Sequence, residues 1–132
     1  MAKLSGLHKL RDWELTEARQ MLASLLGEQN DLVMKRQILE GRIQAELAAL
    51  PNMEHPHDVA RFLAASRAEI DRLSASIQEM ESAISRQQDQ VAERYKDLKT
   101  IEMMQARAEA EAANKARAVE QASLDEVALR RR

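Results

Sequence analysis

The chain has 132 residues, of which 45% are hydrophobic and 32% charged, while aromatic residues make up only 2%. A composition poor in aromatic side chains and rich in Ala, Leu, Glu, Arg and Gln favours long helices over a β-sandwich, a barrel or an α/β enzyme. The formal net charge is −2. Because many phosphate contacts need a basic excess, we expect no nucleic-acid partner.

The cysteine count and the apolar pattern set two further limits. The sequence has no cysteine, so it predicts no disulfide, no thiolate metal site and no cysteine nucleophile. No apolar run approaches the ~20 residues that span a bilayer, and the first residues contain no continuous apolar segment of a signal peptide. We therefore expect a cytoplasmic protein.

Two long helices are predicted, in this order along the chain. The first runs from about Leu4 to Leu50, and Pro51 ends it because proline disfavours the helical conformation before it and has no N–H to donate. Residues 51–57 form the loop. Asp58 is predicted to cap the second helix, which runs from about Val59 to about Leu129.

A seven-residue apolar repeat runs along both predicted helices. In the first helix the a and d positions are Leu15, Ala18, Leu22, Leu25, Gln29, Leu32, Arg36, Leu39, Ile43, Glu46 and Leu50. Leu26, Val33 and Leu47 fall at e, which widens the apolar stripe. In the second helix the a and d positions are Leu63, Ser66, Ile70, Leu73, Ile77, Met80, Ile84, Gln87, Val91, Arg94, Leu98 and Ile101. The predicted fold is all-α: a single antiparallel coiled-coil hairpin with unequal arms, over residues 1–132.

The second helix is predicted to extend beyond the first. If the two helices meet at the loop, the residue numbers of facing positions add up to about 108. The start of the first helix, near Leu4, then lies opposite a residue near 104. Residues 105–132 then overhang. Their a and d positions are Gln105, Ala108, Ala112, Lys115, Val119, Ala122, Glu126 and Leu129. Such an Ala-rich segment is helical by propensity but buries little alone, so we expect it to fit into, or fold upon, something else.

The sequence holds no nucleotide-binding motif, no zinc-protease motif and no calcium-binding loop motif. Carboxylates at helical spacing lack a pocket that would shift their pKa values, so we expect no enzyme, no cofactor and no small-molecule substrate. His55 and His57 would need further metal ligands from Glu54, Asp58 or the distant His8. This set favours solvated turn histidines and no metal site.

Two features are candidates for partner binding. The basic tip Arg130, Arg131 and Arg132 either complements the dipole of a helix C-terminus or docks onto an acidic protein surface; nucleic acid or lipid is the least favoured reading. Phe62 lies one turn into the second helix, near the loop. It either covers the end of the hydrophobic seam or is an exposed anchor for a partner.

The last third of the chain resembles a known family. Residues 99–107, Lys-Thr-Ile-Glu-Met-Met-Gln-Ala-Arg, and residues 120–130, Glu-Gln-Ala-Ser-Leu-Asp-Glu-Val-Ala-Leu-Arg, resemble the C-terminal pattern of the flagellar export protein FliJ and its YscO-type relatives. The most specific part is Leu124, Asp125 and Glu126. The resemblance covers the whole chain in architecture, with similar length, unequal helices, few aromatics and no cysteine.

The resemblance implies a cytoplasmic component of type III protein export, peripherally associated with the inner membrane. It implies a monomeric stalk similar to the central shaft of rotary ATP synthases, whose terminal end enters a hexameric export ATPase, promotes its assembly and activity and couples it to the membrane export gate. Export chaperones are further implied partners. Phe62 matches an aromatic residue that contacts the gate in the family, although Ser66 and Glu69 depart from the family pattern.

Two other function classes remain open. One is a generic coiled-coil adaptor or homodimeric scaffold, in which the overhang pairs with a second copy. The other is a nucleic-acid-binding hairpin, which predicts binding that falls steeply with salt. The sequence does not distinguish a flagellar system from an injectisome.

Overall fold

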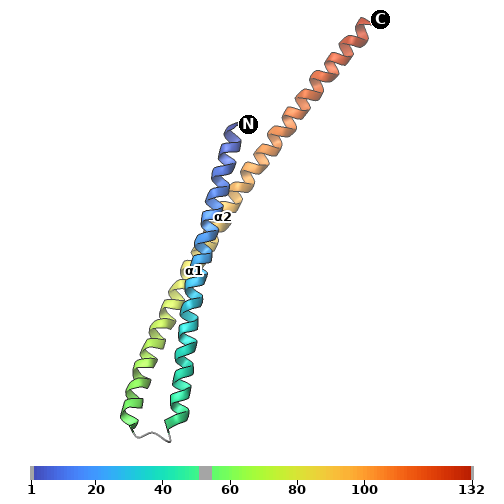
Figure 1. Ribbon diagram of the computed structural model, residues 1–132. Coiled ribbons are helices and arrows are strands. Elements are labelled where there is room, and N and C mark those ends of the chain that lie inside the picture. Colours follow the sequence, from blue (N-terminus) through green and yellow to red (C-terminus); the bar gives the residue numbers. More distant parts are fainter. Residues whose placement is uncertain (1, 51–54, 132) are drawn as a thin grey trace. The chain divides into compact units, whose positions relative to one another are not determined.

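Two long helices of unequal length make up the structure, a computed structural model that describes residues 2–50 and 55–131. Helix α1 spans Ala2–Ala49 and helix α2 spans Pro56–Arg130, with 48 and 75 residues (Figure 1). The described residues contain no strand. The predicted fold class is confirmed: the protein is all-α, and its two helices pack against each other.

The start of α2 differs from the prediction. Pro56 is the first residue of the helix, a position that suits proline because its fixed φ is helical and its missing N–H would have no partner there. The backbone N–H of Asp58 donates to the carbonyl oxygen of His55 at 3.2 Å. Asp58 therefore lies inside the first turn, and its predicted position as the N-cap is wrong. Its carboxylate still lies where the helix dipole favours negative charge.

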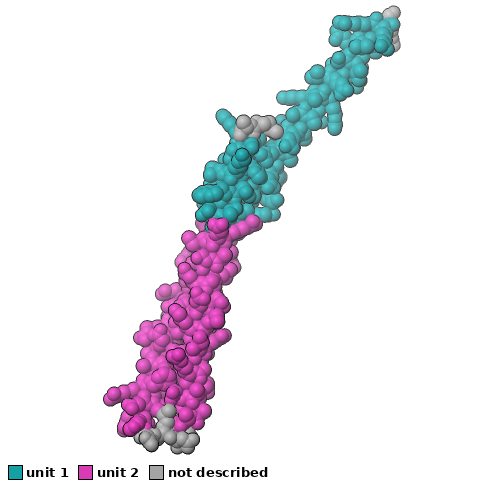
Figure 2. All heavy atoms as spheres, viewed as in Figure 1, with its two compact units in different colours: residues 1–17, 92–132 teal, residues 18–91 magenta. Residues whose placement is uncertain are grey.

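The described chain divides into two units, each with a part of both helices (Figure 2). One unit, called the middle unit below, comprises residues 18–91. The other, the terminal unit, comprises residues 1–17 and 92–132.

The seam, which comprises the predicted a and d positions of both helices up to Ile101, is largely covered. Of its positions, all but Leu50 are buried or half-buried, and Leu50 is 43% exposed. The middle unit buries Ile43, Val59, Leu73, Ile77 and Ile84. The e positions contribute less than expected, because Leu26 and Leu47 are exposed and only Val33 is half-buried.

Two polar residues of the seam in the middle unit have hydrogen-bond partners on the opposite helix. Arg36 Nη1 donates to Ser74 Oγ at 3.3 Å, and Gln87 Nε2 donates to the carbonyl oxygen of Ala18 at 3.0 Å. Satisfied groups of this kind avoid the free-energy cost of burying a polar atom without a partner. They explain why a seam with interruptions still packs.

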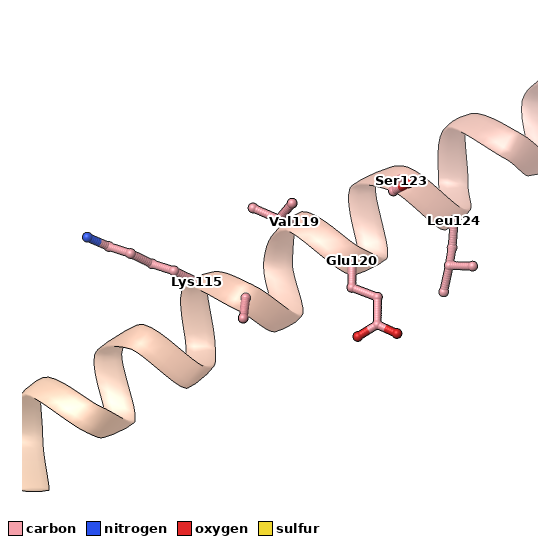
Figure 3. Close-up of a pocket in the computed structure, with 6 residues that line it drawn as sticks. Lys115, Val119, Glu120, Ser123 and Leu124 are labelled. Atoms are coloured by element: carbon pink, nitrogen blue, oxygen red, sulfur yellow. The ribbon is translucent and has the colours of Figure 1, made fainter.

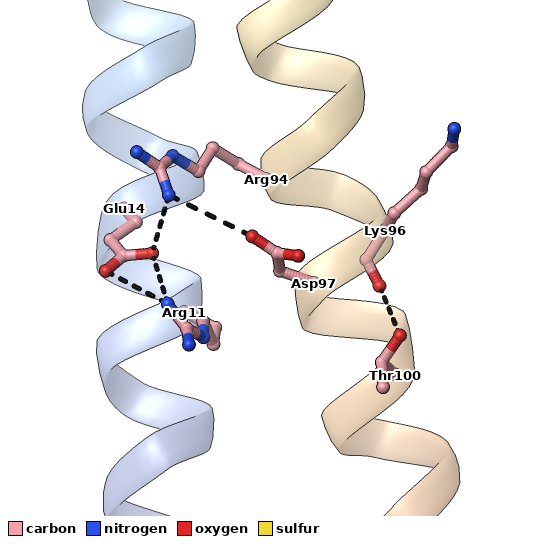
Figure 4. A network of polar contacts seen from close by, with 6 residues as sticks. All are labelled: Arg11, Glu14, Arg94, Lys96, Asp97 and Thr100. Atoms are coloured by element: carbon pink, nitrogen blue, oxygen red, sulfur yellow. Dashed lines mark hydrogen bonds and ion pairs between the residues drawn. The ribbon is translucent and has the colours of Figure 1, made fainter.

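The terminal unit combines an apolar seam with a charged edge. Leu15, Leu98 and Ile101 are buried, and Leu15 is only 2% exposed. Beside them, Glu14 accepts from Arg11 of its own helix and from Arg94 of α2, at 3.0 and 3.4 Å (Figure 4). The pairing of Glu14 with Arg94 lies on the predicted register of the two helices.

Candidate protein-binding surfaces

The end of α2 is an exposed surface of the terminal unit. In Figure 1 this helix continues past the start of α1. Gln105 and Ala108 are half-buried, whereas every described residue from Glu109 to Arg131 is exposed. We call residues 109–131 the overhang. Because Gln105 and Ala108 are still half-buried, the exposed extension begins in the structure four residues later than expected.

The overhang is slim and of mixed charge. Alanine occurs at 110, 112, 113, 116, 118, 122 and 128. The large apolar side chains are exposed, with Val119 at 70%, Leu129 at 69%, Leu124 at 58% and Val127 at 46%. In the heptad frame Val119 and Leu129 lie at a and d, whereas Leu124 and Val127 lie at f and b, so the four residues together do not form one apolar stripe of the usual width.

Figure 3 shows a hollow on the surface of the overhang. Lys115, Ala116, Val119, Glu120, Ser123 and Leu124 line it. All six residues belong to α2, so no second element closes the hollow. A surface of this kind suits contact with another protein, because small-molecule sites enclose most of their ligand.

The candidate residues near the C-terminus lie on this overhang. Asp125 Oδ1 accepts from Gln121 Nε2 at 3.1 Å, and Glu126 pairs with Arg130 at 3.2 Å. Leu124 is free of any such contact within the described part of the chain and exposes its side chain. The backbone N–H of Arg131 donates to the carbonyl oxygen of Val127, and Arg132 lies outside the described residues.

Phe62 belongs to the middle unit and is half-buried, in the second turn of α2. Its neighbour Leu63 is half-buried as well. The partial cover accords with a seam-covering role and still leaves part of the ring open to a partner. Phe62 and the overhang belong to different units.

The histidines do not gather. His55 and His57 are exposed, and Glu54 lies outside the described residues. His8 Nε2 lies 3.5 Å from Glu102 Oε1, in the terminal unit. Within residues 2–50 and 55–131, no group of three or more His, Asp or Glu side chains is placed to hold a metal ion. None of the helices described is long and apolar enough to cross a bilayer.

Glu102 is the centre of a charged cluster that sequence reasoning missed. A hydrogen bond from Lys99 at 3.0 Å, with the charge of Lys99 and a contact to His8, lowers the pKa of Glu102. The same hydrogen bond raises the pKa of Lys99, whose Nζ also lies 5.4 Å from the ring centre of Tyr95. The spacing of Lys99 and Glu102, three residues apart on a helix, is the sequence signal that could have revealed the pair.

These features define a class of protein: a two-helix hairpin whose longer helix offers a free end for contact with another protein. The family model described as "Flagellar FliJ protein" matches residues 3–132. The chain therefore belongs to the FliJ family, as its resemblance predicted, and it is a component of the flagellar export apparatus. No curated protein and no solved structure matches it.

Proposed function

We propose that the chain is a non-enzymatic stalk and coupling component of the export apparatus, acting in the cytoplasm beside the inner membrane. In this proposal the overhang binds the hexameric export ATPase and stimulates it. The part of the hairpin near the loop contacts the export gate and export chaperones. Family membership supports the setting, and the free end of α2 is the observation that carries the proposal.

The overhang has the properties that entry into a ring requires. A helix with side chains is about 10–12 Å wide, and alanine keeps it at the narrow end of that range. At about 1.5 Å per residue, the overhang is roughly 35 Å long. Its exposed acidic and basic residues, such as Glu120 and Arg117, would meet polar groups on the wall of a protein pore.

The direct test measures ATP hydrolysis and hexamer assembly of the cognate export ATPase with and without the full chain. We expect stimulation and co-purification. A chain that neither stimulates the ATPase nor co-purifies with it would overturn the proposal.

A charge reversal locates the contact. Reversing the basic tip, Arg130→Glu with Arg131→Glu and Arg132→Glu, should weaken ATPase binding about 10-fold or more, since charged contacts across an interface are lost and repulsion replaces them. The matched control reverses three exposed arginines of the middle unit, Arg61→Glu, Arg67→Glu and Arg86→Glu. If the control weakens binding as much as the tip variant, net charge is responsible and the assignment to the overhang is wrong.

Leu124 is the proposed apolar anchor of the same contact. Its side chain is 58% exposed, so Leu124→Ala removes little intramolecular packing. We expect a loss of about 1–2 kcal/mol in ATPase binding with an unchanged unfolding midpoint. Ala110→Ser on the overhang is a mild control that should leave binding unchanged.

Phe62 is proposed to contact the export gate. Phe62→Ala and Phe62→Leu are compared for unfolding and for binding to the cytoplasmic part of the gate protein. If the ring contacts the gate, Phe62→Leu retains most of the stability but loses gate binding. If Phe62 only covers the seam, stability falls in Phe62→Ala while gate binding of the folded chain is unchanged. Pull-down of export chaperones by the same variants tests whether they share this surface.

A further inference from the structure

The overhang continues the heptad frame of the buried seam, but its a and d positions face no partner within the described part of the chain. We propose that this face pairs with the same face of a second copy of the chain, as a short antiparallel coiled coil. The proposal concerns the chain in the absence of other proteins, and it replaces the monomer that the family resemblance implies. It does not depend on the proposed role at the ATPase, but the pair must separate before one overhang enters the ring.

The layers of such a pair are complementary in size and charge. In an antiparallel coiled coil an a position of one helix faces a d position of the other. One register of the two overhangs gives these facing residues: Ala112 with the second copy's Leu129, Lys115 with the second copy's Glu126, and Val119 with the second copy's Ala122. Each large apolar residue meets an alanine, and the one basic core position meets the one acidic core position. Two-fold symmetry makes every layer occur twice.

The flanking positions add to the same pattern. At the e positions, Glu109 lies beside the second copy's Arg130 in this register. Arg130 already pairs with Glu126 at 3.2 Å on its own helix. Pairing would therefore place Glu109 and Lys115 of one copy next to Arg130 and Glu126 of the other, with charges that alternate in sign. A single exposed ion pair contributes little to the stability of the pair. Several facing charges that are opposite in sign in this register, and alike in others, favour this register.

Other alignments are less favourable. A parallel pair places Lys115 against Lys115 and Glu126 against Glu126, which repel in both layers. An antiparallel pair that overlaps by one further heptad places Leu129 opposite Gln105, which is already half-buried in the single chain. It also leaves Lys115 facing Val119. The proposed register is thus the deepest overlap that the first turns of α1 permit.

The test is the molar mass of the full-length chain in solution, measured by sedimentation across the micromolar range. We expect a concentration-dependent dimer. Lys115→Glu or Glu126→Lys alone should raise the dissociation constant about 10-fold or more, because each change creates two like-charge contacts in the symmetric pair. The double variant restores opposite charges and should restore dimerisation.

Matched controls carry the same charge changes on the other side of the overhang. Arg117→Glu lies at f and Glu120→Lys lies at b, and both residues are exposed. These variants should dimerise like the wild type. The proposal is overturned if the wild-type chain stays monomeric throughout, if Arg117→Glu is as damaging as Lys115→Glu, or if the double variant fails to restore the dimer.

Disulfide trapping tests the orientation, because the natural chain has no cysteine to interfere. Copies with Ala112→Cys mixed with copies with Leu129→Cys should form a disulfide-linked pair on oxidation. Copies with Ala112→Cys alone should not, since their two cysteines would be about 25 Å apart along the axis at ~1.5 Å per residue. Efficient linking of Ala112→Cys copies alone would show a parallel pair and contradict the register. Sedimentation and trapping use no ATPase, so their failure is separate from failure of the stalk role.

Discussion

The same heptad frame has opposite outcomes in two regions of α2. In the middle unit its a and d positions include Leu73, Ile77 and Ile84, which are buried. In the overhang the corresponding positions include Lys115 and Val119, which are exposed. The comparison shows that periodicity defines which face of a helix is able to pair, whereas the partner helix decides how far pairing extends.

The largest expected difference between the regions is in core packing. Ile77→Ala should lower the free energy of unfolding by about 2–5 kcal/mol, because it removes buried methyl groups and leaves a cavity. Val119→Ala, in the same frame of the overhang, should change it by less than about 0.5 kcal/mol at protein concentrations too low for two copies to pair. Urea unfolding followed by circular dichroism measures both. Equal losses would show that the overhang is packed within the folded monomer.

Helix propensity gives the next difference. A Cβ added at Gly41 meets nothing within 4 Å, so Gly41→Ala should stabilise the paired region by about 1 kcal/mol. The reverse change in the overhang, Ala112→Gly, should reduce local helix content and leave the cooperative unfolding midpoint unchanged. If Gly41→Ala instead lowers the stability, the glycine has a packing role that is not visible in the structure of the single chain.

The ion pair between the helices gives a smaller effect. Glu14 is largely covered and accepts from Arg11 and Arg94. Glu14→Gln should lower stability by about 0.5–1 kcal/mol, and the loss should shrink at high salt because screening weakens the wild-type pair. Glu111→Gln, in the overhang, is the control and should have no effect at either salt concentration.

The smallest expected effect is a dependence on pH at Glu102. Its pKa is lowered in the folded chain, so its contribution to stability is complete above the ordinary value of 4.5 and is lost as the pH falls through the folded value. The pKa of Lys99 is raised, so its contribution is complete below 10.5 and is lost as the pH rises through the folded value. The difference in thermal midpoint between wild type and Glu102→Gln should be present at neutral pH and vanish in acid. A difference that persists in acid would exclude the carboxylate charge as its cause.

The candidate surfaces were only partly predictable from sequence. The positions of Leu124, Glu126 and Arg130 on a free helical end follow from the unequal lengths of the two predicted helices, and the family resemblance singles out Leu124 and Glu126. The pairing of Arg130 with Glu126 is a local i,i+4 contact that the sequence also contains. The sequence does not decide how far Phe62 is buried, because cover near the end of a seam depends on which residues of the other helix reach it.

The two helices, the seam and the existence of a free end were predictable from the sequence, because proline, helix propensity and a seven-residue apolar repeat are local properties. The structure was needed to show that the cover of α2 ends after Ala108, and that Glu14 pairs with Arg94 and His8 with Glu102. These features depend on the register of two helices, and register results from the sum of many weak contacts between residues that are distant in the chain.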